Sequence, residues 1–398
     1  MQSIGASESE VLALFQRPIY PPNNGYSLRA WAWVKAFRSA GVPLHVVVFS
    51  TRHSSSSSVR AEKAAVEALG GTYHSLEQNR AINGLWALWG VRRGLPLQVG
   101  FYSTPFNKKW VHDYLAKHTI STVFSSCARV GGTWFSHPTV KVYLDLVDDV
   151  PAMYRTALPT LSMGLFRWFY TLEHRRLAHW DAQLRQRAQW SYYVFPHSAP
   201  KTKCIPNGVQ RVLPPPVSVK GLRATENPIG TYYFLGPLAY GPNKVAVNYW
   251  HRRVMPLLPA SICGKFIGEG MTTLPNKSPK AHYFGWVEDL SDLLKECQVC
   301  IAPMQSGGGQ LNKVIEAMAS GRLVVGSKAA MQNLMGLTPG ITHIECTTPT
   351  EYVRALQWAA EHPAEAEVIA QKAAEAIQKK YTWEAMDQEV WNIVNKNS

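Results

Sequence analysis

The sequence has few charged residues, few cysteines and no long apolar run. Charged side chains make up 17% of the 398 residues, and the six cysteines are scattered; a typical soluble chain has about 25% charged residues. No apolar run approaches the roughly 18–20 residues of a membrane span, and acidic residues precede the first short apolar run, unlike in a secretory signal. Apolar residues, at 46%, suffice for large cores. We therefore expect a cytoplasmic protein without a disulfide framework.

Acidic residues are scarce in one half of the chain. Residues 1–210 contain 23 Lys and Arg but only 11 Asp and Glu, whereas residues 211–398 contain 18 and 16. A basic half suits a negatively charged partner, such as an anionic membrane surface or a phosphorylated substrate. No helix-turn-helix or RNA-recognition signature accompanies the charge, so we expect no nucleic-acid partner.

Short β-branched and aromatic runs alternate with helical patterns, which predicts an α/β protein with parallel sheets. A proline-rich stretch near residues 210–228 separates two series of strands and is typical of a linker. We predict two Rossmann-like domains that face a central cleft, the GT-B arrangement, over residues 1–212 and 213–382. The final helix, within residues 383–398, is expected to pack back on the first domain. The predicted strands are 11–15, 44–49, 122–126, 141–147 and 191–195, then 231–236, 262–268, 281–286, 299–304 and 323–327.

A glycine-rich turn is the most informative local pattern. Three consecutive glycines at 307–309 follow an apolar strand, and a helix starts near Leu311. Such a turn presents free backbone N–H groups and the positive end of the helix dipole, which suit a phosphate. Lys313 is placed to add a positive charge at a diphosphate, and Glu316, one turn on, to accept hydrogen bonds from ribose hydroxyls. The pattern predicts a nucleotide site.

The chain resembles the family-four glycosyltransferases of the GT-B fold. The stretch EAMASGR at 316–322 matches the family's helix signature, and QLNKVIE at 310–316 is similar to a sugar-transferase subgroup that reads QNKVLEAMA. The resemblance implies a UDP- or GDP-linked sugar donor held by the second domain and an acceptor held by the first. It also implies transfer to a hydroxyl of a saccharide or lipid-linked acceptor in cell-surface polysaccharide biosynthesis, with retention of configuration.

One departure from the family pattern concerns the donor sugar. Glu316 matches the second acid of the family's Glu-x7-Glu motif, and Gly308 replaces the first. The family also places a lysine near the diphosphate, a position that Lys244 matches. We expect no metal or other cofactor, because cations and helix N-termini offset the diphosphate charge and no DxD sequence occurs. The predicted donor-binding residues are Gly307, Gly308, Gly309, Gln310, Asn312, Lys313, Glu316 and Lys244.

Candidate residues of the first domain lie near its predicted strand ends. Gly25 lets the backbone approach a ligand, and Arg29, one helical turn later, is placed to reach a phosphate. Asp148 and Asp149 follow the strand 141–147, where a carboxylate can act as the general base for an acceptor hydroxyl. Helix capping is the alternative interpretation of this pair. The two aspartates and Lys313 are the predicted catalytic residues.

A helical pattern at 161–180 mixes aromatic side chains with Arg167, Arg175 and Arg176. A basic aromatic face of this kind predicts contact with a membrane surface, so that the protein lies peripherally at the inner membrane face. Ordinary packing, with Glu173 near the acceptor cleft, is the alternative.

Other chemistries have weaker support. Cys297 and Cys300 have no second pair of ligands, and the 13 histidines show no HExxH spacing, so we predict no metal site. Three alternatives to a retaining transferase remain open. They are an inverting transferase with an aspartate base, similar to GT-B glucuronosyltransferases, a sugar-nucleotide epimerase of the same fold, and a non-catalytic glycan-binding partner of GT-B fold.

Overall fold

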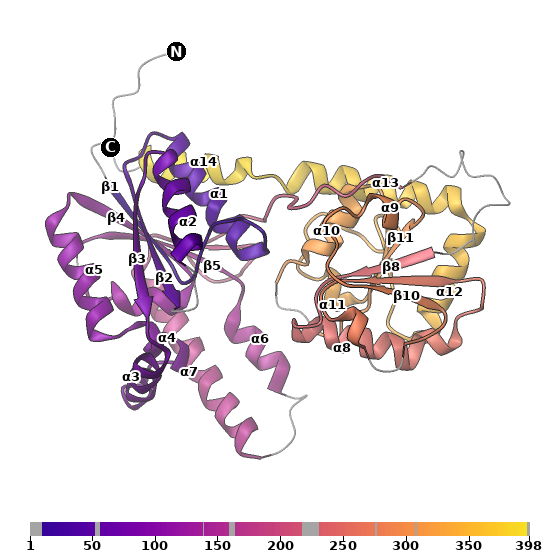
Figure 1. The fold of residues 1–398 in the computed structure, drawn as a ribbon, viewed down its shortest axis with the longest axis horizontal. Coiled ribbons are helices and arrows are strands. Elements are labelled where there is room, and N and C mark those ends of the chain that lie inside the picture. Colours follow the sequence, from indigo (N-terminus) through magenta and orange to yellow (C-terminus); the bar gives the residue numbers. More distant parts are fainter. Residues whose placement is uncertain are drawn as a thin grey trace, which may run out of the picture. The chain divides into compact units, whose positions relative to one another are not determined.

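The computed structural model describes residues 10–51, 56–137, 139–158, 164–216, 231–274, 277–306 and 309–395 (Figure 1). The chain divides into two compact units. Unit 1 comprises residues 1–207 and 383–398, and unit 2 comprises residues 208–382. Each unit has its own sheet and its own core. None of the described helices combines the length and the apolar character needed to span a membrane.

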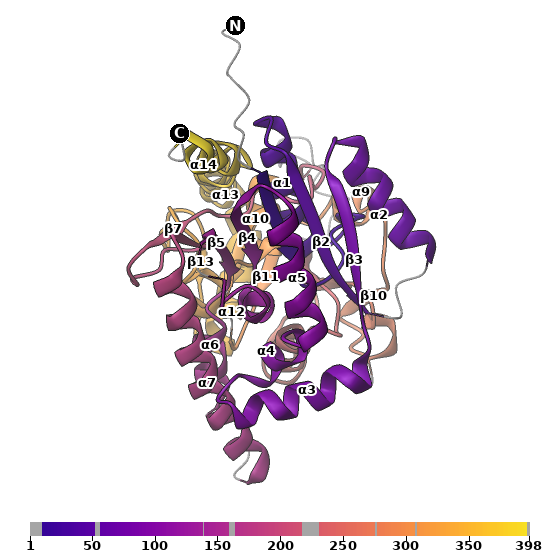
Figure 2. The same cartoon turned by 90° about the vertical axis from the view of Figure 1, so that its left-hand side faces the viewer.

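Unit 1 is built on a seven-stranded parallel sheet of order β3-β2-β1-β4-β5-β6-β7 (Figure 2). Side chains of β1 alternate between its faces, so Val11, Ala13 and Phe15 enter one core cluster and Leu12 and Leu14 the other. Burial on both faces explains why such strands read as continuous apolar runs. The strands are β1 (Glu10–Phe15), β2 (Leu44–Thr51), β3 (Thr72–Gln78), β4 (Ile120–Ser126), β5 (Lys141–Val147), β6 (Trp190–Tyr193) and β7 (Thr202–Cys204).

Helices cover both faces of this sheet (Figure 2). One core cluster joins α1 to the sheet through Trp33, and the other joins α5 and α7 through Val111 and Leu184. The helices are α1 (Gly25–Ser39), α2 (Ser56–Ala68), α3 (Arg80–Arg92), α4 (Leu97–Tyr102), α5 (Pro105–Lys117), α6 (Val150–Ala157), α7 (Leu165–Arg187) and the 3-10 turn η1 (Ala128–Thr133).

The last helix, α14 (Glu384–Asn395), belongs to unit 1 although the chain has first passed through unit 2. It packs against α1. Its Glu389 accepts a hydrogen bond from the Tyr192 hydroxyl over 3.0 Å and pairs with Lys203 Nζ at 2.6 Å. The end of the chain is therefore part of the first core. The α14 residues buried there are Met386, Val390 and Ile393.

Unit 2 contains a six-stranded parallel sheet of order β10-β9-β8-β11-β12-β13. The direction of winding reverses between β8 and β11, and ligands of doubly wound sheets bind at the carboxyl ends of strands beside such a reversal. The strands are β8 (Thr231–Leu235), β9 (Cys263–Ile267), β10 (Ala281–Phe284), β11 (Val299–Ala302), β12 (Leu323–Gly326) and β13 (Ile344–Glu345). The helices are α8 (Gly241–Tyr249), η4 (Trp250–Val254), η5 (Met255–Leu257), η6 (Met271–Thr273), α9 (Ser291–Leu294), α10 (Asn312–Ala319), α11 (Lys328–Met331), α12 (Pro349–Glu361) and α13 (Pro363–Lys380).

The structure confirms the predicted fold class and every predicted strand, with ends shifted by at most two residues. The sequence analysis missed β3, β7 and β13; β3 reads TYHSLEQ, in which polar residues obscure the apolar pattern. The boundary between the units follows Asn207, where we had predicted residue 212. The linker predicted near 210–228 extends into residues 217–230, which lie outside the described residues.

A buried ion pair joins α1 to the end of β5. Arg29 and Asp145 are each 1% exposed, with Nη2 and Oδ1 2.7 Å apart. Arg29 Nη1 donates to the Ile205 carbonyl over 2.8 Å and to Asn207 Oδ1 over 3.0 Å, and Trp33 Nε1 donates to Asp145 Oδ2 over 3.0 Å. The prediction that Arg29 reaches a phosphate is therefore wrong, because its guanidinium is buried and occupied by protein acceptors.

The Arg29→Met substitution is expected to lower the free energy of unfolding by about 3–5 kcal/mol, because it leaves Asp145 buried without its cation. Urea denaturation followed by circular dichroism measures this change. Lys109→Met is the control, since the Lys109–Asp113 pair is exposed and such pairs contribute at most about 1 kcal/mol. Equal losses in the two variants would contradict the structural role of Arg29.

Candidate active site

The main polar cluster of unit 2 lies where β8 ends. Gly236 follows the strand with φ at 143°, and Asn243 of α8 donates from Nδ2 to the Pro237 carbonyl over 2.9 Å. Lys313 of α10 donates from Nζ to Asn243 Oδ1 over 2.6 Å. A Cβ at position 236 would lie 2.6 Å from Asn243 Nδ2, so glycine is required beside this pair. The cluster thus lies at the carboxyl edge of the sheet, beside the reversal of winding.

Lys313 and Glu316, one turn apart on α10, both have pKa values close to neutral pH. Burial lowers the pKa of Lys313 to about 7, although Cys300 and Glu316 act in the opposite direction. Its Nζ lies 3.9 Å from the centre of the Phe234 ring. Burial raises the pKa of Glu316 to about 7, against the charge and backbone N–H of Arg211. An anionic ligand beside Lys313 favours its charged form, and strongly shifted groups of this kind are typical of functional sites.

Those remaining donor residues that the structure describes lie around the start of α10 or on α8. Lys244 is exposed in the first turn of α8. Its neighbour Asn243, which the sequence analysis did not select, is the α8 residue that contacts Lys313. Half-buried residues at the start of α10 are Gly309, Gln310 and Asn312. Gly307 and Gly308 lie outside the described residues.

In unit 1, Asp149 has a structural role that the sequence analysis listed as its alternative. It is the N-cap of α6, accepting a hydrogen bond from the Ala152 N–H over 2.8 Å. Its Oδ2 lies 3.4 Å from Nε2 of His197. Because His197 Nδ1 accepts from the Ala199 N–H over 3.1 Å, the neutral ring carries its proton on Nε2, towards Asp149. The capping interpretation is confirmed for Asp149.

The sequence analysis missed His197. This residue follows β6 (Trp190–Tyr193), the strand that pairs with β5, and its ring stacks on Tyr193 at 4.2 Å between centroids. Its position shortly after a predicted strand could have identified it, because residues that follow the strands of a parallel sheet meet at the carboxyl edge of that sheet.

Asp148, next to the capping residue, is in a different environment. It follows Val147, whose φ of 66° is a left-handed backbone conformation that residues other than glycine rarely adopt. Burial raises the pKa of Asp148 to about 6; the charge of Arg29 opposes this shift and that of Asp145 adds to it. Because Asp149 is engaged as the cap of α6, Asp148 is the better candidate for proton transfer at neutral pH.

Glu173 lines a pocket of about 530 Å³ within unit 1. Its Oε1 accepts a hydrogen bond from the Leu97 N–H over 2.8 Å, and burial raises its pKa. Gly25, the other acceptor residue predicted from the sequence, is the first residue of α1, which Asn24 caps. The residues around Glu173 are mainly apolar or aromatic, including Leu88, Phe101, Tyr102, Tyr154 and Phe169, with Arg129 among them.

Comparison with known proteins indicates the class of enzyme to which this site belongs. Residues 231–362, most of unit 2, match the family described as group 1 glycosyl transferases. This range includes Asn243, Lys313 and Glu316. The protein is a GT-B glycosyltransferase. No curated protein sequence matches the chain.

Solved structures similar to this glycosyltransferase cover at least 97% of its length. HepE of Anabaena, in complex with UDP, is 13% identical with a TM-score of 0.60, over 97% of this chain and 100% of that one. Sucrose-phosphate synthase from Thermosynechococcus elongatus is 14% identical with a TM-score of 0.65, over 97% and 98%. The lipopolysaccharide outer core galactosyltransferase WaaB is 11% identical with a TM-score of 0.59, over 98% and 99%. At these identities the similarity establishes the fold.

The two aspartates of the enzyme are expected to affect stability in opposite directions. Because the folded pKa of Asp148 is raised to about 6, its charge costs stability increasingly as pH rises from about 4 to 6. Asp148→Asn should therefore raise the free energy of unfolding at pH 7.5 by about 1–3 kcal/mol, and by much less at pH 4.5. Asp149→Ala should lower it by about 1 kcal/mol through loss of the cap. Urea denaturation at both pH values checks these signs, and a less stable Asp148→Asn at pH 7.5 would contradict the assignment.

Proposed function

We propose that the enzyme transfers a sugar from a UDP-linked donor to a hydroxyl of a saccharide or lipid-linked acceptor in cell-surface polysaccharide biosynthesis. Unit 2 binds the donor and unit 1 binds the acceptor. The observation that carries this proposal is the pairing of Lys313 with Asn243 beside Glu316 at the carboxyl edge of the second sheet. The solved complexes of HepE with UDP and with UDP-glucose support a uridine nucleotide. The EAMASGR stretch supports membership of family four.

In this proposal the diphosphate lies against Lys313 and the backbone N–H groups at the start of α10. The negative charge of the diphosphate raises the pKa of Lys313 from about 7, so the lysine is protonated in the complex and stabilises the departing UDP. Glu316 accepts hydrogen bonds from the ribose hydroxyls. Lys313 and the helix dipole then supply the charge compensation that other enzymes obtain from a metal ion, so donor binding needs none.

A specific observation favours inversion as a second candidate for the stereochemistry. Asp148, with a pKa of about 6, is suited to accept the proton of the acceptor hydroxyl at neutral pH. A base on the acceptor supports direct displacement with inversion, whereas the family-four resemblance supports retention. The anomeric configuration of the product, read by NMR, separates the two.

Donor binding is expected to depend on Lys313 and Glu316. Lys313→Met and Glu316→Ala should each weaken UDP binding at least tenfold at pH 7, since each loses a hydrogen bond involving a charged group, worth about 1.5–3 kcal/mol. Above pH 7 the wild-type affinity for UDP-glucose should fall, by up to tenfold per pH unit, because Lys313 loses its proton. Lys313→Arg should flatten this dependence, because arginine stays charged. Isothermal titration calorimetry of the wild type and the three variants measures these affinities.

Two further variants test whether these effects are specific. Lys244→Met, which removes an exposed lysine of α8, should leave UDP affinity unchanged. Asp148→Asn should keep UDP affinity but lower the slow hydrolysis of UDP-glucose, in which water replaces the acceptor, by a factor of about 100 or more. Unchanged UDP affinity in both Lys313→Met and Glu316→Ala would remove the donor site from unit 2.

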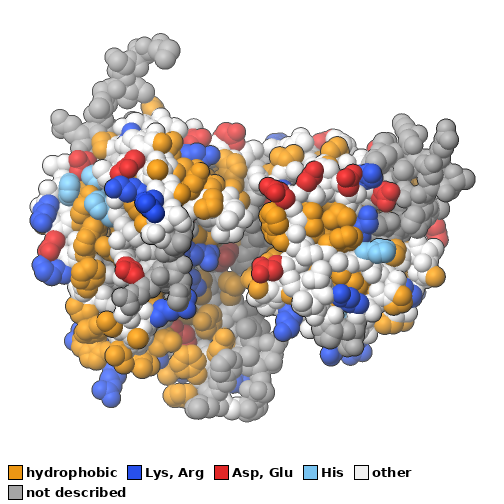
Figure 3. Space-filling model, viewed as in Figure 1, with side chains coloured by type: hydrophobic (Ala, Val, Ile, Leu, Met, Phe, Trp, Pro, Cys, Tyr) orange, Lys and Arg blue, Asp and Glu red, His pale blue; other side chains and the backbone are white. Residues whose placement is uncertain are grey.

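We further propose that the enzyme rests on the inner membrane face through an apolar surface of unit 1. Hydrophobic side chains gather over α3 in Figure 3, where Leu85 and Leu88 are 69% and 62% exposed. The helix has no acidic residue and ends with Arg92, and Arg93 then lies over the Trp89 ring at 3.5 Å. Exposed apolar residues flanked by arginines suit an anionic bilayer. The exposed apolar residues of α3 are Ile82, Leu85, Leu88 and Trp89, and Phe169 lines one pocket together with Leu88.

This surface lies partly outside the segment that the sequence predicted for membrane contact. Within residues 161–180, Trp168 and Phe169 are exposed large apolar residues and Arg175 is exposed as well, and residues 161–163 lie outside the described residues. The larger contribution comes from α3, which the sequence analysis did not identify as a helix. The Glu173 pocket includes Leu88 and Phe169, so a lipid-linked acceptor can reach it from this surface.

Replacing Leu85 and Leu88 together by glutamate should lower binding to vesicles of phosphatidylcholine and phosphatidylglycerol at least tenfold, because each leucine contributes about 1.5–3 kcal/mol when buried in lipid. Co-sedimentation measures bound protein. Val368→Glu, at a residue of unit 2 that is 54% exposed, is the control and should bind like the wild type. Equal sedimentation of the double variant and the wild type would reject this surface as the membrane contact.

A further inference from the structure

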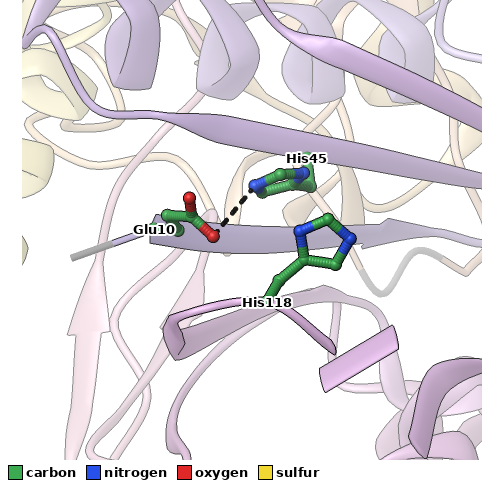
Figure 4. A group of neighbouring side chains, drawn as sticks. All are labelled: Glu10, His45 and His118. Atoms are coloured by element: carbon green, nitrogen blue, oxygen red, sulfur yellow. Dashed lines mark ion pairs between the residues drawn. The ribbon is translucent and has the colours of Figure 1, made fainter. Parts of the chain in front are cut away.

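We propose that unit 1 contains a binding site for a divalent transition-metal ion, best suited to Zn²⁺, formed by Glu10, His45 and His118 (Figure 4). Glu10 is the first residue of β1, His45 the second residue of β2, and His118 directly follows α5. The site thus lies at the amino edge of the first sheet, whereas Asp148 follows the carboxyl end of β5. It is independent of the proposed transfer reaction.

The distances within the cluster fit one metal ion. A ligand atom from each of the three residues lies within 4.8 Å of the other two. His45 Nε2 and Glu10 Oε2 are 3.4 Å apart. Two ligands of a tetrahedral zinc ion with bonds of about 2.0–2.1 Å are separated by about 3.3 Å. The carboxylate and the first imidazole therefore already have the spacing of zinc ligands.

Glu10 directs a buried acceptor at this position. Its Oε2 is shielded from solvent and makes no hydrogen bond to any described residue; it lies 3.4 Å from His45 Nε2, an ion pair only when that histidine is protonated. A buried carboxylate oxygen without a partner is unfavourable. A cation between Glu10 and the two histidines supplies the missing partner, as the side chains in Figure 4 point towards one another.

Neighbouring side chains orient the histidines as ligands. His45 Nδ1 lies 2.9 Å from the Tyr114 hydroxyl and 2.8 Å from Thr72 Oγ1. With its Nδ1 proton donated to one of these hydroxyls, His45 presents the lone pair of Nε2 to the metal, an arrangement typical of ligating histidines. The Tyr114 ring stacks on His118 at 4.2 Å between centroids. One tyrosine therefore positions both imidazoles.

The ligand set selects the class of ion. Two imidazoles and one carboxylate suit Zn²⁺ and its neighbours Co²⁺ and Ni²⁺, whereas Mg²⁺ and Ca²⁺ prefer oxygen ligands alone. His118 is exposed, so the ion can enter from solvent and a water molecule can complete its coordination. A metal here links β1, β2 and the end of α5, and is expected to stabilise unit 1.

Zinc binding is tested on tag-free protein by calorimetry and thermal denaturation. The wild type should bind one Zn²⁺ per chain and show a rise of a few degrees in melting temperature, because a ligand that binds only the folded state stabilises it. Glu10→Gln and His118→Ala should each lose at least tenfold in zinc affinity and lose the rise. His112→Ala, which removes an exposed histidine from α5 outside the cluster, should behave like the wild type. Mg²⁺ should produce no rise.

The visible absorption of bound Co²⁺ separates loss of the metal site from loss of folding. Co²⁺ bound to the wild type should give the visible absorption of a tetrahedral site, and the signal should disappear in His118→Ala while circular dichroism stays unchanged. Absence of stoichiometric zinc binding by the wild type would overturn the proposal. Zinc binding that survives in both Glu10→Gln and His118→Ala would overturn it as well, because the ion would then occupy other ligands.

Discussion

The buried ion pair between Arg29 and Asp145 is the interaction on which unit 1 depends most. It joins α1 to the end of β5, and through Ile205 and Asn207 it holds the segment that leaves the first sheet. Burying two charges is unfavourable unless each is fully engaged, and here the guanidinium and the carboxylate both have additional hydrogen-bond partners. The same pair also acts on Asp148, whose pKa is raised mainly by burial, lowered by the charge of Arg29 and raised by that of Asp145.

At the carboxyl edges of both sheets, burial shifts the pKa values of ionisable side chains towards neutral pH. Lys313, Glu316 and Asp148 have pKa values moved to about 7, 7 and 6 by removal from water. Each is therefore less stable in its charged form than in solvent, which lowers the stability of the folded chain. Groups poised in this way gain or lose a proton easily when a ligand arrives. The arrangement favours chemistry over stability at the two edges.

The two edges of the first sheet differ in character. Its carboxyl edge carries Asp148, which is suited to proton transfer. Its amino edge carries Glu10 and His45, held in position by Thr72 and Tyr114. Parallel strands make this division possible, because all amino ends meet at one edge and all carboxyl ends at the other. The exposed leucines of α3, which begins two residues after β3 ends, form a third surface.

Features that depend on neighbouring residues could be predicted from the amino-acid sequence. Strands buried on both faces were predicted because their apolar runs are continuous, and Lys313 and Glu316 were predicted because one helix places them a turn apart. Other features became visible only in the folded chain. They are the partners of Arg29, the contact of Asn243 with Lys313, the separate roles of Asp148 and Asp149, and the cluster of Glu10, His45 and His118. These features join residues far apart in the chain, whose distances depend on strand order and helix packing. No local spacing carries that information.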